Sequence, residues 1–527
     1  MEGIYVTIRT SLAPLSGSYN IVWVSLIGSR SECPAVRPFT DDQRLLPGSS
    51  CTILIKPDED IGKIVLVRLR LEARPGFPNL DWHCLDVQLK LSSDAAAVEC
   101  FPCDSPGNSV HYLKGFHDRS EPWSSMKELE TLFIYNGNEN TVSTYVHAHW
   151  KEDAFFGYQC LNGCNPLIIR RIHCLPPSLD VTSQMLKDFL PEGSSLGEEL
   201  EKGTIFLLDY EVLDGLPANV INGKQSYIAA PLCLLHYNQH NELKPIAIQL
   251  LMPHLKTSLQ INIQARASLL ATNGVFDKAV GCGMKAVPVL LARGTYRLRY
   301  TSLCVPDDLK ERGLDKLPNC YYAQDALRVW NALHRFVASW VELYYHDDQE
   351  VQQDAELQSW IQEIHTEGYL GFIHTDFPQT FQTIAELSKY ITMVIFTSSA
   401  LHAAVNFSQA SVDFNLWMPN CPAAMLRPPP QVKGTVTEED LLSFFPDVNS
   451  TCRVLIVLFM LSQPSLDYVP LCHYREWYFS SGAPLKLVEK VQQDLRDIAH
   501  DIQKRNSRLE LAYPYLYPDN IENSVAI

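Results

Sequence analysis

His402 and Asn406 are the residues whose types and spacing most directly suggest chemistry in this 527-residue sequence. They are four positions apart, which places both side chains on one face of a helix, about one turn apart. A neutral imidazole and an amide oxygen directed at one point can ligate a metal ion. Alternatively, each is a hydrogen-bonded polar residue of the core, which is the usual state of buried polar groups. The pair alone leaves both interpretations open.

The last residues provide a third candidate ligand. Segment 513–527 is rich in aromatic and then in small apolar residues, with no charged side chain after Glu522. Chain ends are usually polar and frayed, so this composition indicates a buried tail. Burial would carry the α-carboxylate of Ile527 out of water, which is costly without a partner. We therefore expect this carboxylate to meet His402 and Asn406 at a metal, and a donor set without thiolate suits redox-active iron better than zinc.

The elements that position these residues are expected to be helices. Segment 390–409, entered through 384–387, contains no Gly or Pro and predicts one long helix. Its first half is apolar on every side, so we expect it to run through a core. Segments 329–343, 357–364 and 485–505 have helical apolar spacing and should surround it. Lys504 and Arg505 fall in the last turn of the third segment, where cations suit the helix dipole.

The segments around these candidate ligands resemble those of animal lipoxygenases. The motifs are HAAVNFSQ at 402–409, FNLWMPNCPAAMLRPPP at 414–430 and IENSVAI at 521–527. Further matches, in the same order along the chain, are at 150–166, 207–211, 245–250 and 300–306. The resemblance covers nearly all of 150–527, and more weakly the first hundred residues, and is closest to the arachidonate 5-lipoxygenase type. It implies a non-haem iron held by His402, Asn406 and the Ile527 carboxylate.

The resemblance also implies a reaction and a substrate channel. The reaction is removal of a hydrogen atom from a polyunsaturated fatty acid such as arachidonate, followed by addition of dioxygen to give a hydroperoxide. The alternatives are a hydroperoxide isomerase, or a catalytically inactive variant that acts as a binding or regulatory partner. By resemblance, Ala265 matches a position linked to product chirality, and Arg266 matches a partner of the substrate carboxylate. The other implied channel residues, for which ordinary helix packing is the alternative, are Leu269, Ala279, Val280 and Met460.

One part of the family pattern is missing. Animal lipoxygenases carry two further iron-ligand histidines on a helix that follows the strand matching 245–250. Here 245–250 continues directly into Leu251-Met-Pro-His254, and no two histidines lie five positions apart between 240 and 300. We therefore expect an internal deletion near residue 250. Iron ligation needs about three or more fixed protein ligands, and of the three that remain the amide is weak and the tail carboxylate is fixed only if it is packed. We therefore expect weak iron binding and little fatty-acid turnover, together with exposed apolar surface or a void.

The first part of the chain predicts a separate β-domain. Segments 4–10, 21–27, 53–55, 64–71 and 86–91 are rich in β-formers, with Gly, Pro and Ser between them, which favours an antiparallel sandwich. It resembles the PLAT domain of animal lipoxygenases, which implies calcium and peripheral membrane binding. Asp41 and Asp42 match the region of its calcium loops, although two solvated surface carboxylates are the alternative. We expect a β-sandwich over 1–110 and a mainly α-helical lipoxygenase catalytic domain over 111–527.

Composition narrows the function classes. The net charge of −17 argues against a nucleic-acid partner and against a polybasic membrane anchor. The acidic start of the chain is unlike a signal peptide, and the longest apolar run, 454–461, is too short to span a bilayer. The 15 cysteines form no paired framework, and Cys100-Phe-Pro-Cys103 has no second such pair. Free thiols favour a cytoplasmic protein, and the PLAT resemblance implies peripheral membrane association through the first domain.

Overall fold

The structure is a computed structural model, and it describes most of the helices and strands of the chain. The described residues are 3–12, 18, 20–28, 31, 33–37, 45–57, 59–62, 64–72, 82, 84–90, 99–102, 121–125, 128, 145–146, 148–163, 166–221, 223–227, 230–249, 283–368, 376–407, 425–428, 437–451, 468–474 and 482–523. The chain divides into two compact units, Met1–Asn140 with Val432–Arg453, and Thr141–Gln431 with Val454–Ile527.

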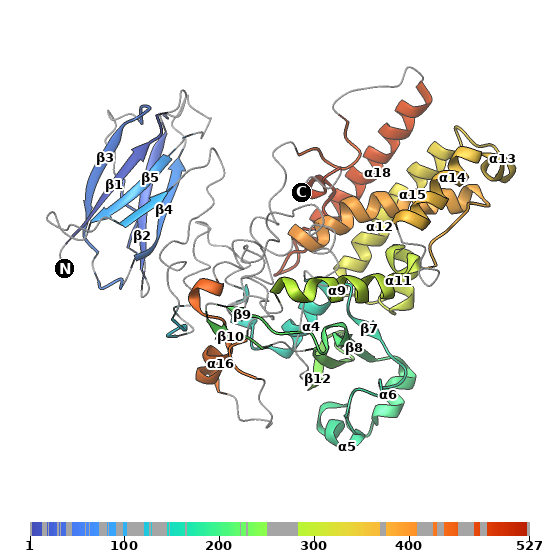
Figure 1. Ribbon diagram of the computed structural model, residues 1–527, viewed down its shortest axis with the longest axis horizontal. Coiled ribbons are helices and arrows are strands. Elements are labelled where there is room, and N and C mark those ends of the chain that lie inside the picture. Colours follow the sequence, from blue (N-terminus) through green and yellow to red (C-terminus); the bar gives the residue numbers. More distant parts are fainter. Residues whose placement is uncertain are drawn as a thin grey trace. The chain divides into compact units, whose positions relative to one another are not determined.

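The N-terminal unit is built on antiparallel strands, as the sequence predicts (Figure 1). One sheet has the strand order β3-β1-β5-β6, and the other pairs β2 with β4. The strands are β1 (Ile4–Thr10), β2 (Ile21–Gly28), β3 (Ser50–Ile55), β4 (Ile64–Glu72), β5 (Cys84–Lys90) and β6 (Glu99–Pro102). The unit also holds the short helix α16 (Glu438–Phe444).

Alternation of apolar and polar residues explains why these strands form a sandwich. Along β1 every second residue is buried, from Ile4 through Val6 to Ile8. These side chains share one hydrophobic cluster with Val22 and Val24 of the other sheet. Side chains that alternate across a strand place one face of each sheet in a common core. The predicted antiparallel sandwich is therefore confirmed.

The second unit contains an antiparallel sheet as well as helices. Its strand order is β12-β11-β8-β7. The strands are β7 (Arg170–Arg171), β8 (Ile205–Asp209), β11 (Leu232–Tyr237) and β12 (Leu243–Gln249), with a small separate pair of β9 (Val220–Ile221) and β10 (Lys224–Gln225). The expected deletion near residue 250 lies outside the described residues, which resume at α9.

The helices of the second unit include those that the sequence predicts. Predicted segments 329–343, 357–364 and 485–505 correspond to α12 (Tyr321–Val341), α14 (Ala355–Glu363) and α18 (Gly482–Asn506). The other α-helices in the described part of this unit are α4 (Asp153–Asn162), α5 (Ser183–Leu186), α6 (Leu196–Lys202), α9 (Gly283–Arg297), α10 (Tyr300–Leu303), α11 (Val305–Glu311), α13 (Asp348–Gln353) and α15 (Ile384–Phe396).

The central helix differs from the uninterrupted α-helix expected over 390–409. It is α-helical in α15 and then continues as π-helix over Thr397–Leu401 and Ala403–Phe407. The Ser399 hydroxyl donates to Ile395 O at 2.6 Å, and the Ser398 hydroxyl to Val394 O at 2.8 Å. Hydroxyls that occupy helix carbonyls in this way compete with the regular backbone ladder. His402 therefore lies between two π-helical segments and Asn406 lies within the second, and such turns are a frequent feature of functional sites.

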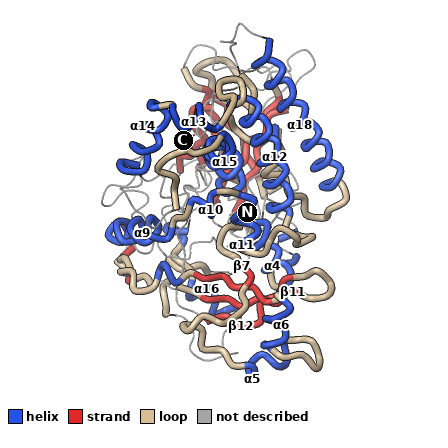
Figure 2. Tube along the Cα trace, turned by 90° about the vertical axis from the view of Figure 1, so that its right-hand side faces the viewer, coloured by secondary structure: helices blue, strands red, loops and turns tan. Residues whose placement is uncertain are grey.

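The central helix lies in a bundle with two long helices. Helix α12 packs against α15 on one side and against α18 on the other, and the three lie side by side in Figures 1 and 2. By length and composition alone, Ile384–Phe407 could cross a membrane, but 61% of its most apolar window is buried inside the protein. Core helices pass the same test, so this is weak evidence for a membrane span, and the expected core position is what the structure shows.

Candidate metal centre

His402 and Asn406 meet on the π-helical part of the central helix. The Asn406 amide nitrogen Nδ2 lies 2.5 Å from His402 Nε2. An amide can be turned by half a rotation, which exchanges Nδ2 with Oδ1. Two ligands at right angles on one metal, with bonds of about 2.1 Å, lie about 3 Å apart. The two side chains are therefore close enough to occupy neighbouring positions on a single ion.

Burial prepares the imidazole for ligation. His402 is 8% exposed and Asn406 only 1%. Burial lowers the pKa of His402 to about 4, so the ring is neutral near neutral pH. A metal needs this neutral form, because a protonated ring has no free lone pair at the ligating nitrogen. The donor types, their separation and the ring's charge state thus fit two ligand positions of an iron centre.

The C-terminal tail is held in place up to Asn523. Ile521 is fully buried, and its carbonyl accepts a hydrogen bond from Leu471 N at 2.9 Å. Asn523 N donates to Val469 O at 2.8 Å, and the Asn523 side chain accepts from Cys472 N at 2.9 Å. The predicted buried tail is thus present as far as the structure describes it. Ile527 lies outside the described residues, so its convergence with His402 stays a prediction.

The other predicted site residues lie outside the described residues. These are Ala265, Arg266, Leu269, Ala279, Val280 and Met460 for the substrate, and Asp41 and Asp42 for calcium. Within the described part of the chain, no group of three or more His, Cys, Asp or Glu side chains could hold a metal. His402 and Asn406 are therefore the part of the candidate centre that the structure brings together.

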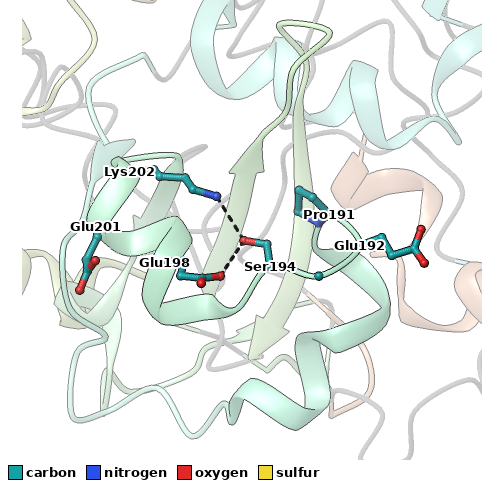
Figure 3. Close-up of a pocket in the computed structure, with 7 residues that line it drawn as sticks. Pro191, Glu192, Ser194, Glu198, Glu201 and Lys202 are labelled. Atoms are coloured by element: carbon teal, nitrogen blue, oxygen red, sulfur yellow. Dashed lines mark hydrogen bonds between the residues drawn. The ribbon is translucent and has the colours of Figure 1, made fainter.

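A surface pocket of about 580 Å³ lies elsewhere in the second unit. It surrounds the start of α6 and is lined by Pro191, Glu192, Gly193, Ser194, Glu198, Glu201 and Lys202 (Figure 3). Three of these residues are acidic, and Lys202 and Glu198 both contact the Ser194 hydroxyl at 3.3 Å. A fatty-acid chain needs an apolar lining, so this polar pocket is not the expected substrate channel.

The ion pair that holds the tail could not be predicted from the sequence. Arg505 of α18 binds Asp325 of α12 with distances of 2.7 and 2.8 Å. The same guanidinium donates to Tyr513 O at 3.3 Å. The sequence indicates a helix-end charge at Arg505, but the two partners are 180 residues apart and share no local pattern. Only the antiparallel packing of α12 on α18 brings them together.

Comparison with known proteins identifies the family. A lipoxygenase family model matches residues 248–513. Arachidonate 12-lipoxygenase, 12R-type, of Mus musculus is 37% identical over 483 residues, which cover 79% of this chain and 68% of that protein. The hydroperoxide isomerase ALOXE3 of Rattus norvegicus is also 37% identical, covering 79% and 67%. Polyunsaturated fatty acid lipoxygenase ALOX15B of Homo sapiens is 35% identical over 529 residues, covering 86% and 77%.

Solved lipoxygenase structures share the fold. The coral 8R-lipoxygenase, described with calcium activation via a C2-like domain, superposes with a TM-score of 0.69. A calcium-dependent 11R-lipoxygenase superposes with a TM-score of 0.67. Each is 23% identical, and each match covers 100% of both chains. At this identity the likeness establishes the fold, which is the expected β-domain followed by a helical catalytic domain.

The expected internal deletion near residue 250 lies outside the described residues and stays a prediction. The family model spans half of the sequence, and relatives at 35–37% identity are covered over two thirds of their length or more, so the chain belongs to the lipoxygenase family.

Proposed function

We propose that this chain is a non-haem iron dioxygenase that converts polyunsaturated fatty acids such as arachidonate into hydroperoxides. The observation that carries the proposal is the buried contact between a neutral His402 and Asn406 on the π-helical core helix. Relatives named as polyunsaturated fatty acid lipoxygenases and a lipoxygenase solved in complex with arachidonate support the substrate class.

The ligand set proposed for iron is His402, Asn406 and the Ile527 carboxylate. Iron bound there would supply the one-electron redox chemistry that removes a hydrogen atom from the methylene between two double bonds. The chain's own residues hold the site: His402 gives a neutral imidazole, and Asn406 an amide oxygen. The surrounding apolar core, including Ala403 and Ala404, excludes water from the ligands.

The proposed substrate contacts follow the family positions. Ala265 and Leu269 would line an apolar channel for the acyl chain, and Arg266 would pair with the substrate carboxylate. Ala279, Val280 and Met460 would form the channel base. Asp41 and Asp42 would help to bind calcium in the N-terminal unit, with peripheral membrane contact and a cytoplasmic location. None of these positions lies in the described part of the chain.

Iron affinity is expected to be low for a lipoxygenase. Between residues 240 and 300 the histidines are His240 and His254, whose separation along a helix would be about 21 Å, too far for both to bind one metal ion. His240 sits in the turn between β11 and β12. The proposed site therefore has one imidazole, one amide and one carboxylate, and an amide is a weaker ligand than an imidazole. We expect the purified protein to carry little iron and to need added ferrous iron for activity.

The test is turnover with ferrous iron supplied. Purified protein is incubated with arachidonate, and conjugated-diene absorbance and oxygen consumption are followed together. We expect slow diene formation that requires iron and is lost in His402→Ala. Equal rates in the wild type and in His402→Ala would contradict the proposal. A fatty-acid hydroperoxide supplied as substrate distinguishes isomerase activity, because isomerisation consumes no oxygen.

A further inference from the structure

Three ion pairs join α12 to α18 in antiparallel register. Arg505 pairs with Asp325, Asp501 with Arg328, and Asp494 with Arg335. As the chain advances along α12, the partner on α18 moves back by nearly the same number of residues. The pairs therefore mark successive levels of one helix–helix interface.

The Asp325–Arg505 pair differs from the other two in its burial. The Asp325 side chain is 1% exposed, whereas Arg328 and Asp501 are 39% and 55% exposed. Arg505 binds both Asp325 oxygens in a fork and lies over the Tyr321 ring, 4.9 Å from its centre. Exposed ion pairs add little stability, whereas a buried bidentate ion pair fixes the relative position of its two side chains.

Arg505 and its neighbour also hold the tail. The Tyr513 carbonyl accepts hydrogen bonds from Arg505 at 3.3 Å and from the Asn506 amide at 2.9 Å. Tyr513 and Leu516 are almost completely buried. The end of α18 thus fixes the start of the tail, while segment 469–473 fixes residues 521–523 through the hydrogen bonds described above.

The register of α12 on α15 relates the pair to His402. Helix α12 is antiparallel to α15, because Trp330 packs on Phe396 and His334 Nδ1 lies 3.2 Å from Thr392 Oγ1. Continuing this register past Phe396, where the helix becomes π-helical, places Asp325 near the level of residue 401. We therefore expect the ion pair that holds the tail to lie at about the level of His402.

We propose that Asp325, Arg505 and Asn506 form a tail clamp, a set of positioning residues that holds segment 513–523 so that the chain end reaches His402 and Asn406. This inference rests on the proposed function, which takes the Ile527 carboxylate as an iron ligand. The four residues after Asn523 span at most about 14 Å, so the anchors confine the carboxylate to a small volume. A ligand already confined loses less conformational entropy when it binds.

The test measures tail order without iron and iron affinity separately. The variants are Arg505→Gln, Arg505→Lys and Asn506→Ala, with Arg328→Gln as the matched control in the exposed pair of the same interface. Hydrogen exchange of peptides covering 513–523 is measured on metal-free protein by mass spectrometry. Ferrous iron binding is measured by equilibrium dialysis, with His402→Ala defining the specific component.

We expect exchange of 513–523 to be on the order of tenfold faster in Arg505→Gln and Asn506→Ala, with α15 peptides unchanged. Iron binding should weaken in both, and Arg505→Lys should restore part of each effect, because lysine keeps the charge but not the fork. Arg328→Gln should change neither quantity. Asn506→Ala keeps the Asp325–Arg505 pair and removes the Asn506 side-chain hydrogen bonds to Tyr513 and Arg505, so it remains informative if Arg505→Gln does not fold.

Two results would overturn the clamp. One is unchanged exchange of 513–523 in both Arg505→Gln and Asn506→Ala. The other is faster exchange with unaltered iron affinity, which would show that the tail is held for another purpose. If the wild type shows no iron binding that depends on His402, the proposed function fails, and the exchange data still decide whether the three residues hold the tail.

Discussion

The helical bundle of α12, α15 and α18 and the sheet lobe of α6, β8 and β11 each bury a carboxylate, but they satisfy it differently. In the bundle, Asp325 depends on Arg505, 180 residues away. In the lobe, most partners of Glu199 lie within five positions of it. Those contacts are Lys202 at 2.7 Å, Ser194 at 2.5 Å and Thr204 at 2.6 Å, with His236 of β11 at 3.1 Å.

The two networks should therefore differ in what they support: the lobe network supports the stability of the fold, and the bundle pair supports the geometry of the candidate site. The lobe network closes on itself around a capped helix, in which Ser195 and Glu198 form a capping box. The bundle pair instead connects α12, α18 and the tail, and we expect it at about the level of His402. We therefore expect changes in the lobe to lower stability with the site intact, and changes in the bundle to alter the site.

The largest expected effect on stability is in the lobe. Glu199→Gln removes the charge that Lys202 and His236 contact inside the fold, and we expect a loss on the order of 3 kcal/mol in the free energy of unfolding. Urea unfolding of the purified chain measures it, with the exposed Glu201→Gln on the same helix as control. A Glu199→Gln protein with wild-type stability, or with altered iron binding, would break the comparison.

The same carboxylate predicts a pH dependence. Burial alone would raise the pKa of Glu199, but hydrogen bonds from Lys202, Ser194 and Thr204 outweigh it and lower the pKa from 4.5 to about 2. A lowered folded-state pKa gives stability that is present above pH 4.5 and lost as the pH falls towards 2, on the order of 3 kcal/mol. Urea unfolding at successive pH values should show this loss, and Glu199→Gln should lack this contribution.

A smaller effect is expected at the amide ligand. Asn406→Ala should weaken ferrous iron binding by roughly tenfold, because the amide is a weak ligand and His402 would still bind the metal without it. Equilibrium dialysis measures the change. Ser388→Ala, which removes a buried hydroxyl on the α-helical part of the same helix, is the matched control and should bind iron as the wild type does. Equal weakening in both variants would assign the loss to helix packing instead of ligation.

The smallest effect is expected at the exposed rim of the bundle. Arg335 is 61% exposed, and its partner Asp494 also contacts Lys490 at 2.5 Å. Arg335→Gln should therefore cost less than about 1 kcal/mol in urea unfolding. A loss as large as that expected for Glu199→Gln would mean that exposure does not limit the contribution of an ion pair in this fold.

The sequence predicts those features whose cause is local. The strands of the N-terminal unit and helices α12, α14 and α18 follow from apolar periodicity, and the contact of His402 with Asn406 follows from their spacing. The π-helical turns depend on the Ser398 and Ser399 hydroxyls and on packing, so periodicity alone cannot reveal them. The Asp325–Arg505 pair depends on the register of two distant helices, which no sequence window contains.

In the lobe, too, local contacts could be predicted from the sequence and long-range contacts could not. The capping box at Ser195 and Glu198 could be recognised from the sequence, since its residues are three apart. The approach of His236 to Glu199 could not, because it requires β11 to pair with β8 beside α6. Long-range polar contacts are thus the part of this fold that the structure adds.

The central claim is that His402 holds iron on the core helix. The direct measurement is equilibrium dialysis of ferrous iron against the metal-free wild type and His402→Ala, under anaerobic conditions near neutral pH. The account predicts a weak single site in the wild type that is lost in the variant, with affinity reduced by at least on the order of 100-fold. Identical binding curves for the two proteins would contradict it.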